Sequence, residues 1–346
     1  MDYLNIWNYK DDKYPFQFFI SGRGYGKTYS ALKGLSDGKV SEKLLFMRRT
    51  KQELDLITDV NGKEGANPFK KLNKNEGTNL GFVKTKDGLS TIYERELLDD
   101  KLQPKGLPLG YGVALSTISS LRGIDFSDCS DWVYDEFIPE VHVSKMRGEG
   151  DALLNAYETV NRNRELEGEK PISFFALGNS NNLNVPIFQS LGIVTDLERM
   201  LRKGKQNKLY PDRGLAVHIF GDSSDFTQKK SQTALYRLTK GTKFSEMSLK
   251  NKFAFDDFSL VEYKNIKGYS PICSLYDFTI WQDKEGLSLY CSYARGTCKH
   301  YNMDTLQGRR SFKSEIAPNL QGMFIKGYIK FESYDIKLKI VEQLFS

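Results

Sequence analysis

The sequence FQFFISGRGYGKT, residues 16–28, decides the fold class. Its first part, residues 16–20, is apolar apart from one glutamine and follows Pro15, which predicts a buried strand. The second part, SGRGYGKT, fits the P-loop pattern of a small residue, four free positions and Gly-Lys-Thr, with Ser21 in place of the usual first glycine. The helix-like sequence YSALKGL follows. A strand, a glycine-rich loop and a helix in this order predict an α/β domain that binds a nucleoside triphosphate.

Each part of this loop has an expected role at the nucleotide. The glycines let successive backbone N–H groups point at the phosphates. Lys27 is expected to reach the β- and γ-phosphates, and the Thr28 hydroxyl is expected to hold Mg²⁺, so ATP and Mg²⁺ are the expected ligands. The residues predicted to bind the nucleotide are Ser21, Gly22, Arg23, Gly24, Tyr25, Gly26, Lys27 and Thr28.

Polar side chains follow two further apolar segments. Residues 132–134 end in Asp135 and Glu136, where we expect Asp135 to bind Mg²⁺ and Glu136 to polarise the attacking water. This pair is typical of the additional-strand, catalytic-Glu branch of P-loop ATPases. Asn179 follows the short strand predicted over residues 172–177, a position suited to a polar sensor of the γ-phosphate, although it is also an ordinary turn residue.

The remaining pattern predicts a parallel sheet followed by a smaller domain. Short strands at 44–47, 172–177 and 215–220 alternate with helical segments, and a hairpin is expected to turn at Asp87-Gly88. The basic sequence TQKKSQT, residues 227–233, is expected to be a loop. Hairpins dominate from about residue 258. The expected division is a P-loop ATPase domain over 1–227, a linker over 228–257 and a smaller α+β domain over 258–346.

Composition narrows the class of protein. The 22 Phe and 19 Tyr can fill a core, no apolar run approaches the roughly 20 residues of a membrane helix, and the four Cys form no CxxC pair. We therefore expect a soluble intracellular protein without membrane or zinc sites. Residues 1–200 carry 26 basic and 29 acidic residues, whereas residues 201–346 carry 24 and 15. This imbalance indicates either a polyanionic partner or a solvated Lys-rich surface.

Three arginines lie outside the P-loop at positions that could serve phosphoryl transfer. Arg122 lies in the SSLRG turn, and Arg162 and Arg164 follow a predicted helix over residues 152–160. An arginine supplied by a neighbouring subunit can stabilise the charge of the transition state. The alternative is that each is a solvated arginine at the surface, and spacing alone favours this alternative.

Taken together, these segments resemble the DNA-packaging (encapsidation) motor ATPases of small podovirus-type tailed bacteriophages. The resemblance lies in FISGRGYGKTYS, LFMRRTKQEL, WVYDEF, TVNRNRE, LGNSNN and GTKFSEMSLKNKF, which occur in order along the chain. It is weakest over residues 59–110. The P-loop alone is generic, and its combination with MRRTKQEL, YDEF and TVNRNRE is more specific.

The resemblance implies site residues as well as a function. Arg162 corresponds to an arginine finger that acts in trans, and Arg122 lies where the family has a trans-acting lysine. Asp135 and Glu136 correspond to the Mg²⁺-binding and catalytic acids, and Asn179 to the polar residue after the sensor strand. The residues implied to be catalytic are Glu136, Arg162, Arg122 and Asn179. Arg48, Arg49 and Lys51 correspond to a basic segment near the nucleotide for which no roles are assigned.

The implied assembly is a homopentameric ring that hydrolyses ATP and translocates double-stranded DNA into a preformed procapsid. Its implied partners are the DNA, the portal (connector) and a packaging RNA. The ring would act in the host cytoplasm at the portal vertex and would be absent from the mature virion. The candidates for DNA contact in the pore are Lys70, Lys71, Lys84 and Lys86, for which a solvated surface loop is at least an equal alternative.

The resemblance also implies an RNase H-like C-terminal domain that has lost its nuclease acids. The alternative is a terminase-type large subunit with an active C-terminal nuclease. Asp277 and Asp283 lie in or beside a predicted hairpin, but a two-metal site needs three or four converging carboxylates. Asp304 and Glu332 are scattered, so the nuclease is the less favoured alternative.

Overall fold

The computed structural model describes residues 4–121, 123–139, 146, 148–180, 183–220, 224–242, 245 and 259–345. The chain divides into two compact units. The N-terminal unit comprises Met1–Leu191 and Lys203–Phe255, and the C-terminal unit comprises Gly192–Arg202 and Asp256–Ser346. None of the helices in the described ranges is both long enough and apolar enough to cross a membrane.

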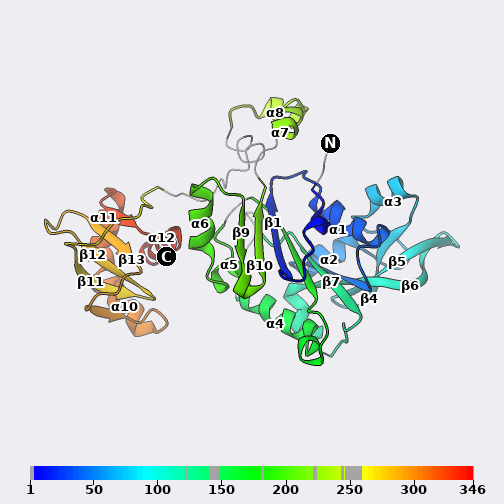
Figure 1. Cartoon of the computed structure of the whole chain (residues 1–346), viewed down its shortest axis with the longest axis horizontal. Helices are drawn as coiled ribbons and strands as arrows, with labels where there is room; N and C mark the ends of the chain where they lie inside the picture. Colours follow the sequence, from blue (N-terminus) through cyan, green and yellow to red (C-terminus); the bar gives the residue numbers. More distant parts are fainter. Residues whose placement is uncertain are drawn as a thin grey trace. The chain divides into compact units, whose positions relative to one another are not determined.

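Among the described residues, the strands of the N-terminal unit form one sheet in the order β3-β4-β5-β6-β2-β7-β8-β1-β10-β9 (Figure 1). The strands from β6 through β10 in this order are parallel to one another. β5 is antiparallel to β4 and β6, and β9 is antiparallel to β10. The predicted α/β class with a parallel-dominated sheet is therefore confirmed. The strands are β1 (Phe16–Ser21), β2 (Lys43–Arg48), β3 (Thr58–Asp59), β4 (Leu80–Lys86), β5 (Leu89–Leu98), β6 (Lys101–Ala114), β7 (Cys129–Asp135), β8 (Ser173–Asn179), β9 (Asn207–Tyr210) and β10 (Leu215–Ile219).

Helices connect these strands, and apolar side chains fill the space between the sheet and the helices that pack on it. The central strands are apolar on both faces because helices cover a parallel sheet on both sides. Phe19, Phe46, Val133 and Phe175, from four different strands, are fully buried in one cluster. The helices are η1 (Ile6–Tyr9), α1 (Lys27–Ser36), α2 (Lys51–Ile57), α3 (Lys70–Glu76), η2 (Leu115–Leu121), α4 (Glu149–Asn161), η3 (Arg164–Glu167), α5 (Pro186–Ser190), η4 (Pro211–Arg213), α7 (Ser224–Ser231) and α8 (Ala234–Leu238).

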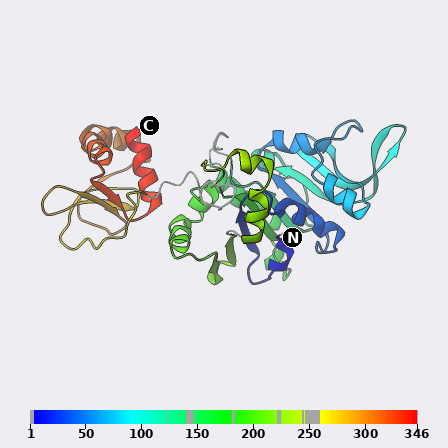
Figure 2. The same ribbon diagram turned by 90° about the horizontal axis from the view of Figure 1, so that it is seen from above.

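The predicted hairpin at Asp87-Gly88 is confirmed by the antiparallel pairing of β4 with β5. The long hairpin of β5 and β6 then extends past the rest of the sheet (Figures 1 and 2). The loop predicted over residues 227–233 is wrong in part, because α7 continues to Ser231. Gln and Lys are good helix formers, so a polar and basic composition did not exclude a helix there.

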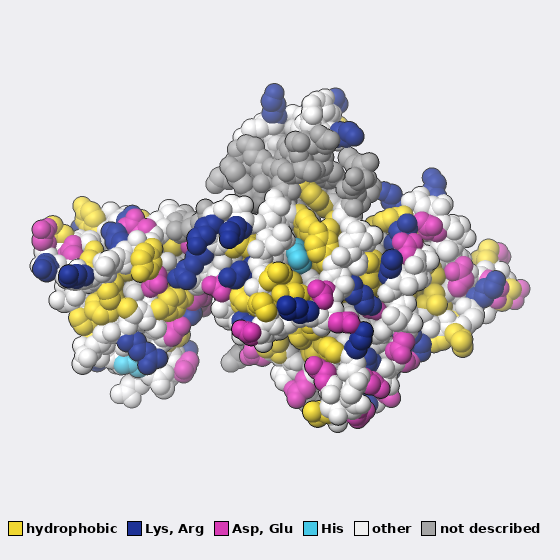
Figure 3. Space-filling model, viewed as in Figure 1, with side chains coloured by type: hydrophobic (Ala, Val, Ile, Leu, Met, Phe, Trp, Pro, Cys, Tyr) yellow, Lys and Arg dark blue, Asp and Glu magenta, His cyan; other side chains and the backbone are white. Residues whose placement is uncertain are grey.

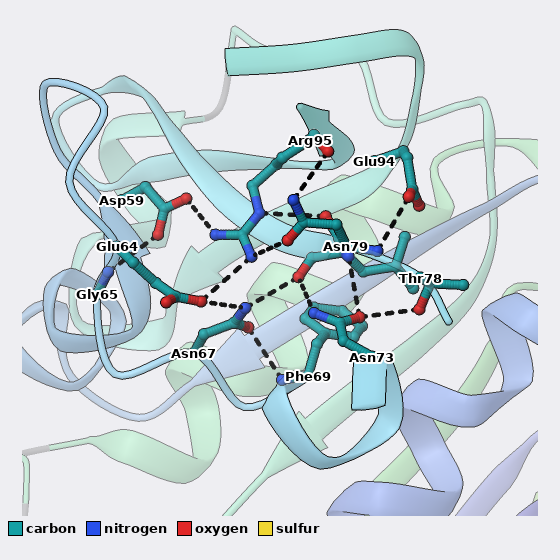
Figure 4. Close-up of polar contacts among 11 residues, drawn as sticks. Asp59, Glu64, Gly65, Asn67, Phe69, Asn73, Thr78, Asn79, Glu94 and Arg95 are labelled. Atoms are coloured by element: carbon teal, nitrogen blue, oxygen red, sulfur yellow. Dashed lines mark hydrogen bonds and ion pairs between the residues drawn. The ribbon is translucent and has the colours of Figure 1, made fainter. Parts of the chain in front are cut away.

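Polar contacts organise the segment where the family resemblance is weakest (Figure 4). The Arg95 side chain is almost fully buried, and its guanidinium contacts Asp59 Oδ2 at 2.5 Å, Glu64 Oε1 at 3.3 Å and Asn79 Oδ1 at 2.9 Å. A Cβ atom placed on Gly81 would lie 2.4 Å from Arg95 Cζ, so only glycine fits beneath this guanidinium. The network joins β3, β4 and β5 through one side chain.

Two asparagines close the loop that carries α3. The side-chain amides of Asn67 and Asn73 both donate to the carbonyl oxygen of Leu80, at 2.9 and 2.8 Å. Asn67 Oδ1 accepts a hydrogen bond from the Phe69 backbone N–H, one residue before α3. The start of α3, with Lys70 and Lys71, is therefore held in a defined place.

The C-terminal unit is an α+β structure with its own core. Its described strands form a sheet in the order β14-β11-β12-β13-β15, in which β11, β12 and β13 form an antiparallel meander. β14 is parallel to β11, and β15 is parallel to β13. The elements are α6 (Val194–Arg202), β11 (Ser270–Leu275), β12 (Phe278–Gln282), β13 (Leu289–Ser292), β14 (Lys299–Tyr301), α10 (Leu306–Glu315), α11 (Ala317–Ile325), β15 (Ile329–Phe331) and α12 (Tyr334–Phe345).

Helix α6 groups with the C-terminal unit, although the expected division placed its residues in the N-terminal domain. Val194, Leu197 and Met200 of this helix are buried. Buried Glu198 accepts a hydrogen bond from the backbone N–H of Tyr334 at 2.9 Å. A carboxylate at the start of α12 satisfies an N–H group that has no partner within the helix and interacts favourably with the helix dipole. The sequence did not predict this association, because Glu198 and Tyr334 are 136 residues apart.

Candidate functional site

The predicted P-loop, residues 21–28, lies at the carboxyl end of β1, next to the ends of β7 and β8. Gly24 and Gly26 adopt positive φ angles of 88° and 81°, which side chains with a Cβ rarely allow. The loop borders a cleft of about 370 Å³. The cleft is lined by Arg23, Gly24, Tyr25, Gly26, Lys27, Thr28, Tyr29, Asp135, Glu136, Leu177, Gly178 and Asn179. The sheet order therefore brings the predicted P-loop, acid pair and sensor asparagine to one cleft.

The chain segment before β1 braces the P-loop and α1. The Leu4 N–H donates to the Tyr25 carbonyl oxygen at 3.1 Å, and the Trp7 indole donates to the Ser30 carbonyl oxygen at 2.8 Å. The indole packs so closely on α1 that a Cβ atom on Gly34 would lie 2.2 Å from it. The segment before β1 therefore holds α1, whose first residues are Lys27 and Thr28, in place.

Lys27 is buried, and its ammonium donates to Ser21 Oγ at 2.7 Å and to Asn179 Oδ1 at 3.2 Å. Desolvation by burial lowers its pKa to about 8, although Asp135 and Glu136 favour the charged form. Ser21, the departure from the usual glycine, thus contributes a hydroxyl acceptor for the P-loop lysine. Asn179 contacts the same ammonium, which is a geometry that a sensor of the γ-phosphate would need.

Thr28 and Asp135 provide two adjacent oxygen atoms. Thr28 Oγ1 donates to Asp135 Oδ1 at 2.9 Å, across from the P-loop to the end of β7. Hard oxygen donors at this spacing are the ligands that Mg²⁺ takes beside substrate phosphates, so these residues fit a magnesium site. Burial raises the pKa of Asp135, and Arg48 opposes this rise.

Arg48 contacts both acids of the pair, a role that the sequence did not reveal. Its guanidinium donates to Asp135 Oδ2 at 2.9 Å and to Glu136 Oε2 at 2.5 Å. Glu136 has a positive φ angle of 59°, which is uncommon for a residue with a side chain. Because β2 and β7 are neighbours in the sheet, their carboxyl ends place these three residues together. The signal in the sequence was an arginine directly after a buried strand.

Arg162 lies away from this cleft. Helix α4 runs from the carboxyl end of β7 back toward the amino end of β8, and Arg162 is the residue that ends it. Its guanidinium donates to the Ile124 carbonyl oxygen at 3.0 Å and pairs with Asp125 at 3.2 Å. Like Glu136, it has a positive φ angle, here 49°. Arg122 lies outside the described residues.

The four candidate lysines lie on two different elements and are all exposed. Lys70 and Lys71 begin α3, where the Lys71 ammonium lies 5.7 Å from the centroid of the Tyr29 ring. Lys84 and Lys86 lie near the end of β4. On the face of the N-terminal unit seen in Figure 3, basic and acidic side chains are interspersed. The structure therefore does not single these lysines out as one basic surface.

The family model for podovirus DNA encapsidation proteins (Gp16) matches residues 5–345. The chain belongs to this family. The DNA packaging proteins of Bacillus phages PZA and phi29 are each 27% identical over 344 residues, covering 95% of this chain and 92% of theirs. A chain of the bacteriophage Phi-29 viral genome packaging motor assembly has the same fold, with a TM-score of 0.67, 23% identity and coverage of 99% of both chains.

A second encapsidation structure extends the comparison of the fold. The Phi-28 gp11 DNA packaging motor matches with a TM-score of 0.55 and 20% identity, covering 98% of this chain and 95% of that chain. Both structural matches extend over almost the whole chain. The encapsidation family therefore accounts for the C-terminal unit as well as the P-loop unit.

In this encapsidation family member, the acids considered for a nuclease serve other contacts. Asp283 accepts hydrogen bonds from Ser288 Oγ at 2.6 Å and from the Leu287 N–H at 2.8 Å in the turn between β12 and β13. Asp277 pairs with Lys339 of α12. Within the described ranges, no three His, Cys, Asp or Glu side chains are grouped so that they could hold a metal ion.

Proposed function

We propose that this protein is an ATP-hydrolysing ring motor that translocates double-stranded phage DNA into a preformed procapsid. The observation that carries the proposal is the hydrogen bond of 2.9 Å between Thr28 and Asp135, with Glu136 beside it. This pair joins the two halves of a P-loop ATPase site, which the sequence holds more than 100 residues apart. Membership of the encapsidation family supports DNA as the translocated molecule and the procapsid as its destination.

Each side chain of the cleft has a task in phosphoryl transfer. Lys27 and the P-loop N–H groups bind the β- and γ-phosphates, and Asn179 orients the same end of the substrate. Thr28 and Asp135 would hold Mg²⁺, which neutralises charge on the phosphates when it is bound. Glu136 orients the attacking water and accepts its proton. The cleft thereby supports hydrolysis of ATP to ADP and phosphate.

Arg48 sets a condition on this reaction. The Arg48 guanidinium donates to Oε2 of Glu136, and a carboxylate oxygen held in this ion pair is not available to the attacking water. Glu136 must therefore exchange its contact with Arg48 for one with water before it can act as a base. Hydrolysis would therefore be slow until nucleotide binding separates Glu136 from Arg48.

Arg162 would act on the nucleotide of a neighbouring subunit. It lies at the end of the sheet opposite to its own P-loop, so it cannot complete its own cleft in this conformation. A head-to-tail ring would bring that end of one subunit to the cleft of the next. We accordingly propose a homopentamer with Arg162, and with Arg122 as a second basic residue, acting in trans.

The remaining assignments follow from the family and complete the proposal. The C-terminal unit is proposed to be an RNase H-like docking domain without nuclease activity. The proposed partners are double-stranded DNA, the portal and a packaging RNA. The protein is proposed to act in the host cytoplasm and to be absent from the mature virion. Lys70, Lys71, Lys84 and Lys86 remain the candidates for contact with the DNA phosphates.

A procapsid assay tests this function. The full-length protein, procapsids, any packaging RNA that the procapsids carry, phage DNA and ATP are incubated together, and packaged DNA is measured as DNA protected from DNase. We expect protection with the wild type and none with Lys27→Ala or without ATP. DNase-sensitive DNA in the presence of active ATP hydrolysis would contradict the packaging function. Nicking of supercoiled plasmid in Mn²⁺ would instead favour the nuclease.

A further inference from the structure

Lys230 of α7 lies beside the P-loop, although it is about 200 residues away in the sequence. Its Nζ donates a hydrogen bond to the main-chain carbonyl oxygen of Arg23, a residue that lines the phosphate cleft. Helix α7 follows β10, which pairs with β1 in the sheet. Because β10 and β1 are parallel neighbours, α7 begins at the same edge of the sheet as the P-loop.

Two further relationships define the position of the Lys230 ammonium. It lies 5.1 Å from the centroid of the Tyr236 ring, and Tyr236 is buried on α8. The face of an aromatic ring attracts an ammonium, so this cation–π interaction favours the observed position of the Lys230 side chain. Arg23 and Lys27 belong to the same loop, so the Lys230 ammonium lies against the loop that carries Lys27.

Two like charges that are held near each other repel, and the repulsion is relieved when an anion binds between them. In a P-loop, that anion is the terminal part of the triphosphate, which the P-loop lysine contacts. Lysine carries its charge on a flexible stem with four carbons, so Lys230 can move from the Arg23 carbonyl to a nearby phosphate oxygen while α7 stays in place.

We propose that Lys230 is a phosphate ligand of the nucleotide site, supplied by α7 of the same subunit. It binds the β- or γ-phosphate and not the base or the ribose. This inference rests on the proposed ATPase function, since it needs a nucleoside triphosphate in the cleft. It adds a residue from outside the P-loop and the acid pair to that site.

Nucleotide titrations test the proposal. Fluorescent mant-ATP and mant-AMP are titrated into the full-length protein with Mg²⁺, for the wild type and for Lys230→Ala, Lys230→Arg, Lys229→Ala and Lys27→Ala. We expect Lys230→Ala to raise the Kd for ATP about ten- to a hundredfold, as the loss of a charged hydrogen bond does. Its Kd for AMP should equal that of the wild type. Lys230→Arg should restore part of the affinity, and exposed Lys229 is the matched control from the same helix.

The outcomes separate this inference from the proposed function. An unchanged Kd for ATP in Lys230→Ala overturns the inference, and so does an equal loss for ATP and AMP or an equal loss in Lys229→Ala. If the wild type binds ATP no better than Lys27→Ala, the proposed function fails instead. Thermal unfolding without nucleotide checks the fold, and Lys230→Gln replaces the alanine variant if that variant unfolds earlier than the wild type.

Discussion

Arg49 and Glu149 form a bidentate ion pair inside the N-terminal unit. Arg49 Nε lies 2.7 Å from Glu149 Oε1, and Nη2 lies 2.9 Å from Oε2. The side chains are only 2% and 4% exposed. The pair ties the end of β2 to the first turn of α4, the helix that ends at Arg162. A contact beside the nucleotide cleft therefore fixes the base of the helix that carries the proposed finger.

Replacing Glu149 by alanine should destabilise the N-terminal unit by about 3–5 kcal/mol, because the buried Arg49 guanidinium would lose its carboxylate partner. Denaturant unfolding followed by fluorescence measures this loss. Glu158→Ala, an exposed position on the same helix, is the control and should change stability by less than about 0.5 kcal/mol. Equal stability of the two variants would show that the pair contributes nothing.

Replacing Glu136 by glutamine should lower turnover about 10²–10⁴-fold, which is the range for losing a general base. The amide has the same size, so ATP binding and thermal stability should be retained. Phosphate release at saturating ATP and a mant-ATP titration measure the two effects, with exposed Glu169→Gln as the control. Turnover within a few-fold of the wild type would remove Glu136 from the mechanism.

Replacing Arg162 by alanine should lower hydrolysis about 10³–10⁵-fold, the range for losing an arginine finger. Mixing this variant with Lys27→Ala subunits should restore activity, because each Lys27→Ala subunit supplies Arg162 to an intact neighbouring cleft. Phosphate release from the mixture at several ratios is the measurement.

Arg164→Ala is the matched control for that experiment. The Arg164 guanidinium donates to the carbonyl oxygens of Ser127 and Cys129, so its loss should lower the Tm and leave complementation unchanged. A mixture of Arg162→Ala and Lys27→Ala that stays inactive, although rings form, would contradict action in trans.

His218 should make the stability of the N-terminal unit depend on pH. Burial lowers its pKa from 6.5 to about 4, and its ring nitrogens contact Gln17 at 2.8 Å and Asn207 at 2.9 Å. Between these two pH values the unfolded state binds the proton and the folded state does not. The free energy of unfolding should therefore fall by up to about 3 kcal/mol as the pH drops from 6.5 to 4.

Urea unfolding across this pH range provides the measurement for His218. The slope of stability against pH should be flatter in His218→Gln than in the wild type, even if the variant is less stable at every pH. His300→Gln, at an exposed position of the C-terminal unit, is the matched control. Parallel curves for His218→Gln and the wild type would contradict the assignment.

The nucleotide cleft was the part of the molecule most open to prediction from sequence. Ser21, Lys27 and Thr28 act within one short loop, and Asp135 was recognisable because it ends an apolar strand. Their joint position follows from a general rule, since the carboxyl ends of parallel strands meet at one edge. The hairpin at Asp87-Gly88 was predictable for a similar reason, because local residues determine a tight turn.

Other features depended on which elements become neighbours. Arg48 meets Glu136 only because β2 lies beside β7, and no local pattern reports that order. Lys230 reaches the P-loop because β10 lies beside β1, whereas its own sequence looked like a polar loop. Helix α6 joins the C-terminal unit through Glu198, which finds its partner 136 residues later. These contacts join residues that are distant in the sequence, so they cannot be predicted from short stretches of it.

The packing of Arg95 over Gly81 constrains how this protein can change by mutation. Any side chain at position 81 collides with the guanidinium, and loss of that guanidinium leaves buried Asp59 without its counter-ion. Neither position can be altered first without a penalty, so the glycine and the arginine should be inherited as a pair. A homologue that has another residue in place of Gly81 or Arg95 should also differ at the other position and at Asp59. Correlated changes at these three positions would therefore support an alignment of this segment.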